Sequence, residues 1–172
     1  MLSSYTVSPL ARQHDRTQFS CGYEILDRYL SKQASQDIKR RVAAVFVLTE
    51  QRNSVVKGYY TLSATSVLLH ELPKTLQKKL PKYPSLPATL IGRLAVDKTV
   101  QGKGVGEKLL VDALIRAYQH SQDIGSIAIV VDAIDEQAKR FYLHYDFLAF
   151  DGYDQKLFLP MLEVKKLCRI SR

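Results

Sequence analysis

Hydrophobic side chains recur at helical spacing in three parts of the chain. In residues 22–40 the apolar stripe consists of Ile25, Leu26, Tyr29, Leu30 and Ala34. A second stripe lies in residues 105–117 and consists of Val105, Leu109, Leu110, Ala113, Leu114 and Ala117. A short third stripe, in residues 135–145, consists of Ala138, Phe141, Tyr142 and Tyr145. These patterns predict three amphipathic helices.

Runs of apolar and β-branched residues predict the strands. Residues 42–50 are a continuous apolar run, and residues 55–69 are predicted to be its hairpin partner. Residues 88–97 and 126–133 are two further strands, and the unbroken apolar character of the second predicts burial on both faces. Residues 72–87 contain four prolines and are predicted to form an excursion with one helical turn. The segments FLAFD and QKLFLPMLEV are expected to finish as an antiparallel pair.

The order of these elements predicts an α/β (α+β) fold. We expect a mixed, mostly antiparallel sheet with helices on both faces. The length of 172 residues suits a single domain over 1–172, with a basic C-terminal tail from about residue 164 to Arg172.

Composition places the chain among soluble globular proteins, with 46% hydrophobic and 24% charged residues. No run approaches a membrane span and the N-terminus lacks the apolar core of a signal peptide, so we expect a cytoplasmic protein without membrane contact. Cys21 and Cys168 lie far apart and the four histidines are scattered, which argues against a metal site or a disulfide framework. The net charge of +8 indicates attraction to polyanions, although a solvated basic surface would give the same total.

Three alternating glycines, Gly102, Gly104 and Gly106, precede the second helix. Glycine adopts positive φ easily, so that backbone N–H groups can converge on one anion beside the helix N-terminus. The nucleotide P-loop is excluded because Glu107 and Lys108 follow Gly106, and Glu107 also occupies the third glycine position of the dinucleotide fingerprint. A diphosphate remains a suitable ligand, and a flexible turn is the alternative.

The pattern Gln101-x-x-Gly104-x-Gly106, between a strand and an amphipathic helix, resembles the acyl-CoA pyrophosphate motif of the GNAT acetyltransferase superfamily. The downstream pattern Asp135-x-x-Ala138-x-x-x-Tyr142-x-x-x-Asp146-Phe147 is similar to the Asn-x-x-Ala-x-x-x-Tyr-x-x-x-Gly-Phe that GNAT proteins often carry. The resemblance covers nearly the whole chain and implies the GNAT fold.

The resemblance also implies where acetyl-CoA binds. Backbone groups of Leu94, Ala95 and Val96 would pair with the pantetheine arm, in a gap beside residues 127–132. The pyrophosphate would lie on Gln101, Gly102, Lys103, Gly104, Val105 and Gly106, with Lys103 adding charge. Asp135 and Phe141 complete the implied cofactor site. The chemistry would be direct attack of an amine on the thioester, with no metal.

Tyr142 takes the position of the family's tyrosine beside the thioester sulfur. A phenol has a pKa of about 10, so it can donate a proton to the departing thiolate. The alternative is a core tyrosine on the apolar face of its helix. Two departures from the family pattern matter: Asp135 replaces the usual asparagine and loses an amide donor, and Asp146 replaces a glycine at some cost if positive φ is required there.

Four stretches, residues 19–30, 58–67, 80–97 and 156–161, resemble the toxins of toxin–antitoxin modules within this superfamily. That subgroup acetylates the α-amino group of aminoacyl-tRNA, which blocks peptide-bond formation. An α-amino group has a pKa near 8, so no strong general base is required. Arg93, in a strand beside the site, is expected to hold a carboxylate, an RNA phosphate or a structural partner.

Basic residues in three segments are candidate contacts to tRNA phosphates. The first group is Lys32, Lys39, Arg40 and Arg41; the others are Lys74, Lys78, Lys79 and Lys82, and Lys165, Lys166, Arg169 and Arg172. The resemblance implies two protein partners, an antitoxin of ribbon-helix-helix type with an acidic C-terminal segment and a second copy in a homodimer. Two alternatives stay open: a GNAT enzyme that acetylates a protein N-terminus, a polyamine or a small-molecule amine, and an inactive GNAT fold that serves as a binding module.

Overall fold

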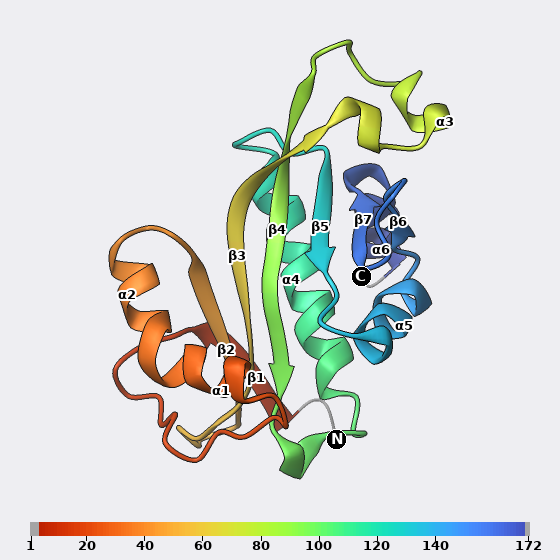
Figure 1. Cartoon of the computed structure of the whole chain (residues 1–172). Helices are drawn as coiled ribbons and strands as arrows, with labels where there is room; N and C mark the ends of the chain where they lie inside the picture. Colours follow the sequence, from red (N-terminus) through yellow and green to blue (C-terminus); the bar gives the residue numbers. More distant parts are fainter. Residues whose placement is uncertain (1–3, 171–172) are drawn as a thin grey trace. The chain divides into compact units, whose positions relative to one another are not determined.

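The computed structural model describes residues 4–170 and contains a mixed, mostly antiparallel sheet (Figure 1). Its hydrogen-bonding order is β1-β2-β3-β4-β5-β7-β6. The strands are β1 Tyr5–Pro9, β2 Ala44–Glu50, β3 Val56–Leu68, β4 Ser85–Val96, β5 Ala128–Asp132, β6 Leu148–Ala149 and β7 Lys156–Pro160. The α-helices are α1 Glu24–Arg28, α2 Ala34–Lys39, α3 Lys74–Gln77, α4 Val105–Ser121, α5 Glu136–His144 and α6 Met161–Ile170. The predicted fold class is confirmed.

The chain divides into two compact units. The first contains the residues up to Ser63 together with Gly92–Ala113, and the second contains Ala64–Ile91 and the residues from Leu114 onward.

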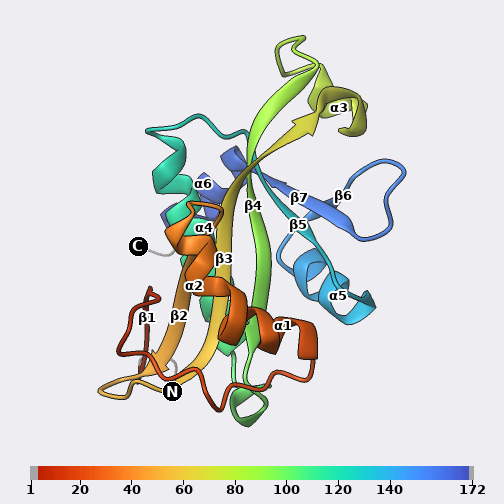
Figure 2. The same ribbon diagram turned by 60° about the vertical axis from the view of Figure 1, so that its left-hand side comes forward.

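In the first unit, helices pack on both faces of the strands, as predicted. Tyr59 of β3 lies in a buried cluster with the first helical segment, where its ring is 6.2 Å from that of Tyr29. Its neighbour Tyr60 points to α4 instead and donates a hydrogen bond to Asp112. The alternation follows from the two-residue period of a strand. Figures 1 and 2 show α1 and α2 running beside β2 and β3.

The first helix differs from its prediction in two respects, its continuity and the position of Ile25. It consists of α1, a π-helical turn over Tyr29–Gln33, and α2. Tyr29, Leu30 and Ala34 are buried as predicted, whereas Ile25 is 71% exposed. The assignment of Ile25 to the apolar stripe was wrong, because at 100° per residue it lies about 130° from the mean direction of Tyr29, Leu30 and Ala34.

In the second unit, β5 is buried from Ala128 to Val131, as its apolar run predicts. Val130 pairs with Leu90 of β4 in parallel and with Phe158 of β7 in antiparallel register. The predicted excursion over residues 72–87 contains the short helix α3 (Figure 2). A 3₁₀ turn at Leu69–Glu71 precedes the excursion, between it and the end of β3.

The C-terminal segment was predicted incorrectly beyond Pro160. Residues 161–170 form helix α6 rather than continuing the strand into a tail. Met161 and Val164 are buried while Leu162 and Glu163 are exposed, so the missed signal was the three-residue spacing of the buried positions. Arg172 and the side chains of Cys168 and Arg169 lie outside the part of the chain that is described. Within residues 4–170 no helix has the length and apolar character needed to cross a membrane.

Candidate active site

The loop that follows β4 is anchored by a buried carboxylate. Asp97 caps the 3₁₀ turn Lys98–Val100 by accepting hydrogen bonds from the backbone N–H (2.9 Å) and hydroxyl (2.6 Å) of Thr99. Its other oxygen accepts the backbone N–H of Ser20 at 3.0 Å. Burial alone would raise the pKa of Asp97, but these hydrogen bonds outweigh it and lower the pKa below its usual value. Asp97 is therefore ionised at neutral pH and fixes the start of the loop.

Gln101 ties the next part of the loop to the protein backbone. Its Nε2 donates to the carbonyl of Val96 at 2.8 Å and to that of Cys21 at 2.9 Å. The side-chain amide is thus engaged inside the protein, which gives a physical reason for a glutamine at the first position of the glycine motif. The glycines after it are presented from a fixed base.

Two of the three alternating glycines have the positive φ that their residue type favours, and the third, Gly106, lies in the first turn of α4. Gly102 and Gly104 have φ of +76° and +80°. A Cβ at Gly102 would meet no heavy atom within 4 Å, so glycine is required there by the backbone conformation rather than by space. Lys103 between them is exposed.

Helix α4 begins directly after the loop and is packed firmly at its start. Val105 is buried, and Gly58 of β3 makes room for the helix, because a Cβ at Gly58 would lie 2.8 Å from Cδ1 of Leu109. The backbone N–H of Lys108 donates to the carbonyl of Gly104 at 3.1 Å. The first N–H groups of a helix have no acceptor within it, and they carry its positive dipole end. With Gly106 as its second residue, α4 presents these groups beside the loop.

The strand expected to hold pantetheine lies beyond the described parallel ladder. That ladder pairs Thr89, Leu90 and Ile91 of β4 with residues 129–131 of β5. Farther along β4, Ala95 is buried in the core of the first unit, while Leu94 and Val96 are partly exposed.

The helix that carries Tyr142 is capped at both ends by the residues of its motif. At the N-terminus, Oδ1 of Asp135 accepts the backbone N–H of Ala138 at 2.8 Å. Aspartate and asparagine cap helices equally well. The replacement of the family's asparagine by Asp135 therefore preserves this local function.

At the C-terminus of α5, Asp146 has a positive φ of 68°. The N–H of Phe147 donates to the carbonyl of Tyr142 at 3.2 Å, and that of Asp146 donates to Leu143 at 3.1 Å. These two bonds and the left-handed residue form a Schellman cap. The accompanying apolar contact is also present, since the rings of Tyr142 and Phe147 are 5.3 Å apart. Position 146 therefore has a positive φ, which is the condition under which Asp146 in place of glycine carries a cost.

Tyr142 is buried among aromatic rings but its hydroxyl is unused. Phe141 packs against it edge-on at 5.2 Å. Burial raises the pKa of Tyr142, so the phenol is protonated at neutral pH. Within residues 4–170 the Tyr142 hydroxyl has no hydrogen-bond partner. Every fully buried side-chain oxygen or nitrogen in the same residues has a hydrogen-bond partner. Tyr142 as a whole is buried, at 7% exposure.

The predicted substrate-binding residues of the first unit are cationic and accessible. Lys39, Arg40 and Arg41 are exposed at the end of α2. Arg93 is half-buried on β4, and its Cζ lies 3.6 Å from the centroid of the Tyr29 ring. The Tyr29 hydroxyl donates to the buried Asp37, which sequence reasoning missed. The available signal was the position of Asp37 three residues after Ala34, on the buried stripe.

The predicted site residues fall into two groups. The first unit holds the residues of the glycine loop, of Leu94–Val96, of the cationic end of α2, and Arg93. The second unit holds Asp135, Phe141 and Tyr142. In residues 4–170 no group of three or more histidine, cysteine, aspartate or glutamate side chains is arranged to hold a metal ion.

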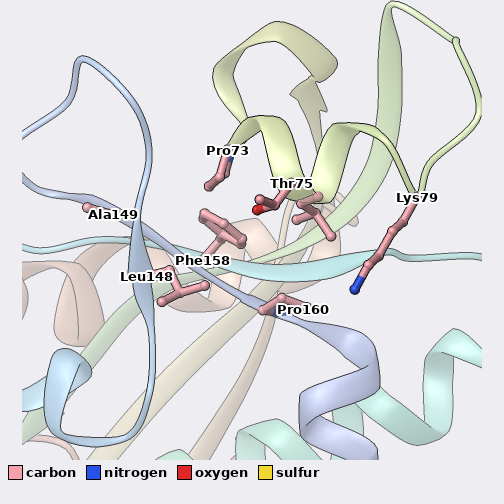
Figure 3. Close-up of a pocket in the computed structure, with 8 residues that line it drawn as sticks. Pro73, Thr75, Lys79, Leu148, Ala149, Phe158 and Pro160 are labelled. Carbon is pink, nitrogen blue, oxygen red and sulfur yellow. The ribbon is translucent and has the colours of Figure 1, made fainter.

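The second unit also contains an apolar hollow of about 450 Å³ (Figure 3). It is lined by Pro73, Thr75, Leu76, Lys79, Leu148, Ala149, Phe158 and Pro160. Of the residues predicted to bind tRNA only Lys79 lines it, and none of the predicted cofactor residues does.

Comparison with protein families gives a match over residues 41–148 to the acetyltransferase (GNAT) domain. The tRNA-acetylating toxin of Mycobacterium tuberculosis is 38% identical over 133 residues, which cover 77% of this chain and 78% of that protein. The probable toxin TacT of Sinorhizobium fredii is 28% identical over 169 residues, which cover 94% of this chain and 93% of the relative.

Several solved structures are similar in fold to this chain over almost its entire length. A tyrosine-to-phenylalanine mutant of KacT has a TM-score of 0.91 at 32% identity, covering 95% of this chain and 99% of that one. AtaT complexed with acetyl-methionyl-tRNAfMet has a TM-score of 0.88 at 29% identity, with coverage of 95% and 99%. AtaTR bound with AcCoA has a TM-score of 0.84 at 27% identity, with coverage of 96% and 99%. A mutant of the toxin AtaT bound to the C-terminus of the antitoxin AtaR has a TM-score of 0.82 at 25% identity, with coverage of 95% and 98%.

Proposed function

This chain belongs to the GNAT acetyltransferase family, and we propose that it is a toxin that transfers an acetyl group from acetyl-CoA to the α-amino group of an aminoacyl-tRNA. An acetylated α-amino group cannot form a peptide bond, so translation stops. The observation that carries the proposal is the anchored loop 101–106, with positive φ at Gly102 and Gly104, in a chain 38% identical to a tRNA-acetylating toxin.

The residues of the loop fit the pyrophosphate of acetyl-CoA. Gly102 and Gly104 turn the backbone, α4 offers its first N–H groups, and Lys103 adds a positive charge. Acetyl-CoA supplies the acetyl group activated as a thioester. Backbone groups of Leu94, Ala95 and Val96 bind the pantetheine arm, and the complex of AtaTR with AcCoA supports this use of the fold.

Tyr142 acts as the general acid that protonates the departing thiolate. Its protonated phenol and its unused hydroxyl support this role over that of a purely structural tyrosine. Asp135 and the Schellman cap at Asp146 hold both ends of α5, and Phe141 packs beside the ring. All three residues position Tyr142, and Asp135 and Phe141 also bind the cofactor.

The acceptor is the charged end of a tRNA. The net charge of +8 and the exposed Lys39, Arg40 and Arg41 suit a polyphosphate backbone. A solved complex of the neighbour AtaT contains acetyl-methionyl-tRNAfMet, which supports the same class of acceptor.

The protein partners follow from the same relationship. An antitoxin of ribbon-helix-helix type binds the basic surface through an acidic C-terminal segment, and the toxin forms a homodimer in the cytoplasm. The AtaT mutant bound to the C-terminus of AtaR supports an antitoxin partner. The two units act as a single domain, and the family match, which includes residues of both, supports this.

The proposal is tested by incubating the protein with labelled acetyl-CoA and bulk aminoacylated tRNA. Label is expected in the tRNA fraction, and mild base, which cleaves the aminoacyl ester, should release it as an N-acetyl amino acid. Deacylated tRNA is the matched control and should remain unlabelled.

Spermidine and peptides with free N-termini, assayed at equal amine concentration, test the other acceptor classes. Faster transfer to any of these than to aminoacyl-tRNA would overturn the proposal. Binding of acetyl-CoA without transfer to any acceptor would instead identify an inactive binding module.

A further inference from the structure

The guanidinium of Arg93 is stacked on an aromatic ring, and its donors are not used within the described protein. Arg93 lies on β4 directly before Leu94, with its Cζ 3.6 Å from the Tyr29 ring centroid. It forms no hydrogen bond or ion pair with any residue in 4–170. A stacked arginine offers up to five N–H donors in a fixed plane.

Tyr29 is itself held from two directions. Its hydroxyl donates to Oδ2 of Asp37 at 2.8 Å, and Oδ1 of Asp37 accepts from Nε2 of Gln33 at 3.0 Å. The ring of Tyr29 packs nearly parallel to that of Tyr59, at an interplanar angle of 15°. Tyr29 and Gln33 bound the π-helical turn, a feature frequent at functional sites. The ring under Arg93 therefore cannot reorient easily.

The ionisation of this cluster is constant near neutral pH. Burial and the hydrogen bond to Asp37 raise the pKa of Tyr29 to about 12, so the phenol stays neutral. The hydrogen bond from Gln33 outweighs burial and, together with Tyr29 and the charge of Arg93, lowers the pKa of Asp37. Asp37 is thus ionised, but both of its oxygens already accept hydrogen bonds from its neighbours. The N–H edge of Arg93 is left for an external acceptor.

The chemistry of the acceptor substrate limits what that ligand can be, and this step rests on the proposed function. In aminoacyl-tRNA the α-carboxyl group is esterified to the terminal ribose and carries no charge. Unless the amino acid is acidic, the anions nearest the reacting amine are the phosphates of the terminal nucleotides. A planar guanidinium matches two oxygens of a phosphate in bidentate fashion.

We propose that Arg93 binds a phosphodiester at the 3′ end of the aminoacyl-tRNA, and that Tyr29 and Asp37 are positioning residues that orient its guanidinium. Arg93 precedes the strand Leu94–Val96 that is assigned to pantetheine, so the bound phosphate lies beside the acetyl donor's arm. The guanidinium of Arg93 is held against the Tyr29 ring, whereas Arg40 and Arg41 are exposed at the end of a helix and have no such ring contact within residues 4–170.

The test compares three acceptors that carry the same neutral amino acid: charged tRNA, an aminoacyl-CCA trinucleotide and aminoacyl-adenosine without phosphate. Arg93→Ala should lower kcat/KM about 10- to 100-fold for the first two, as expected for loss of a charged hydrogen-bonded contact. With aminoacyl-adenosine it should match the wild type, and the affinity for acetyl-CoA should not change. Arg12→Ala removes an exposed arginine of the N-terminal segment and serves as the charge-matched control.

Two further variants test the positioning residues. Tyr29→Phe retains the ring and should retain most of the activity, whereas Tyr29→Leu should lose activity selectively on the phosphate-bearing acceptors. Thermal unfolding is measured in parallel, because Tyr29 is buried. If a variant loses activity only because it is less stable, its activity should fall equally with all three acceptors.

The outcomes separate this inference from the proposed function. If the wild type acetylates the acceptors but Arg93→Ala loses equally on all three, or on none, Arg93 does not bind a phosphate and only this inference fails. If the wild type acetylates none of the three, the proposed function fails and the inference fails with it.

Discussion

Replacing Asp146 by glycine tests how the C-terminal cap of α5 is built. Asp146 has a φ of +68°, a conformation that costs a non-glycine residue about 1–2 kcal/mol, somewhat less for aspartate. Its carboxylate also lies at the negative end of the helix dipole, which costs about 0.3–1 kcal/mol. Glycine removes both of these costs, but it lowers the stability by about 0.4–1 kcal/mol because it gives the unfolded chain more conformational freedom. Asp146→Gly should therefore raise the free energy of unfolding by about 1 kcal/mol.

Urea unfolding followed by circular dichroism measures this change, and a thermal scan should show a rise in Tm of about 2–4 °C. Asp146→Asn separates the two terms, since it removes the charge while tolerating positive φ, and should stabilise by a smaller amount. Asp146→Ala should be no more stable than the wild type. The reasoning is refuted if glycine destabilises the protein, or if alanine stabilises it as much as glycine does.

Three further perturbations test the site and the second unit. Tyr142→Phe should lower kcat about 100- to 10,000-fold while leaving acetyl-CoA affinity and thermal stability nearly unchanged, and single-turnover acetylation at the wild-type rate would remove Tyr142 from the mechanism. Gly104→Val forces a β-branched residue into a φ of +80° and should abolish acetyl-CoA binding in calorimetry while the circular dichroism spectrum is retained; unchanged affinity would place the cofactor elsewhere. Glu71 accepts a hydrogen bond from the Tyr153 hydroxyl and forms an ion pair with Lys156. These interactions outweigh the effect of burial and lower the pKa of Glu71 in the folded protein. The ionised Glu71 therefore stabilises the fold above its unfolded pKa near 4.5, and this contribution is lost as the pH falls through the lower folded pKa. The difference in unfolding free energy between wild type and Glu71→Gln should accordingly shrink below about pH 4.5, and a difference independent of pH would contradict this assignment.

Most of the fold could be predicted because its elements have strong periodicities. The β5 run is apolar without interruption, and the α4 stripe continues over several turns, so both were identified correctly. The failures lie where short patterns are ambiguous. The four residues MLEV fit a strand as well as a helix, and only the buried spacing of Met161 and Val164 distinguishes the two.

The site was predictable where the backbone conformation requires particular residues. Glycine at 102 and 104 is the residue type that a positive φ favours, and both positions have one, as does Asp146 in the family's glycine position. Gly106 lies in α4 and is not among the glycines with positive φ. The cluster around Arg93 was not predictable, because it depends on a π-helical turn and on a tertiary contact between β4 and Tyr29. Local periodicity contains no information on which strand residue will stack on a helical ring.

The identity of the acetylated amine tests the central claim most directly. The protein is incubated with acetyl-CoA and a mixture of aminoacylated tRNAs, the RNA is digested with nuclease, and the 3′-terminal aminoacyl-adenosines are analysed by mass spectrometry. We predict one added acetyl group on the α-nitrogen of the aminoacyl moiety, formed about 100- to 10,000-fold more slowly when Tyr142→Phe replaces the wild type in a single-turnover reaction. Acetyl transfer to another amine in the mixture, with the aminoacyl-adenosines left unmodified, would contradict it.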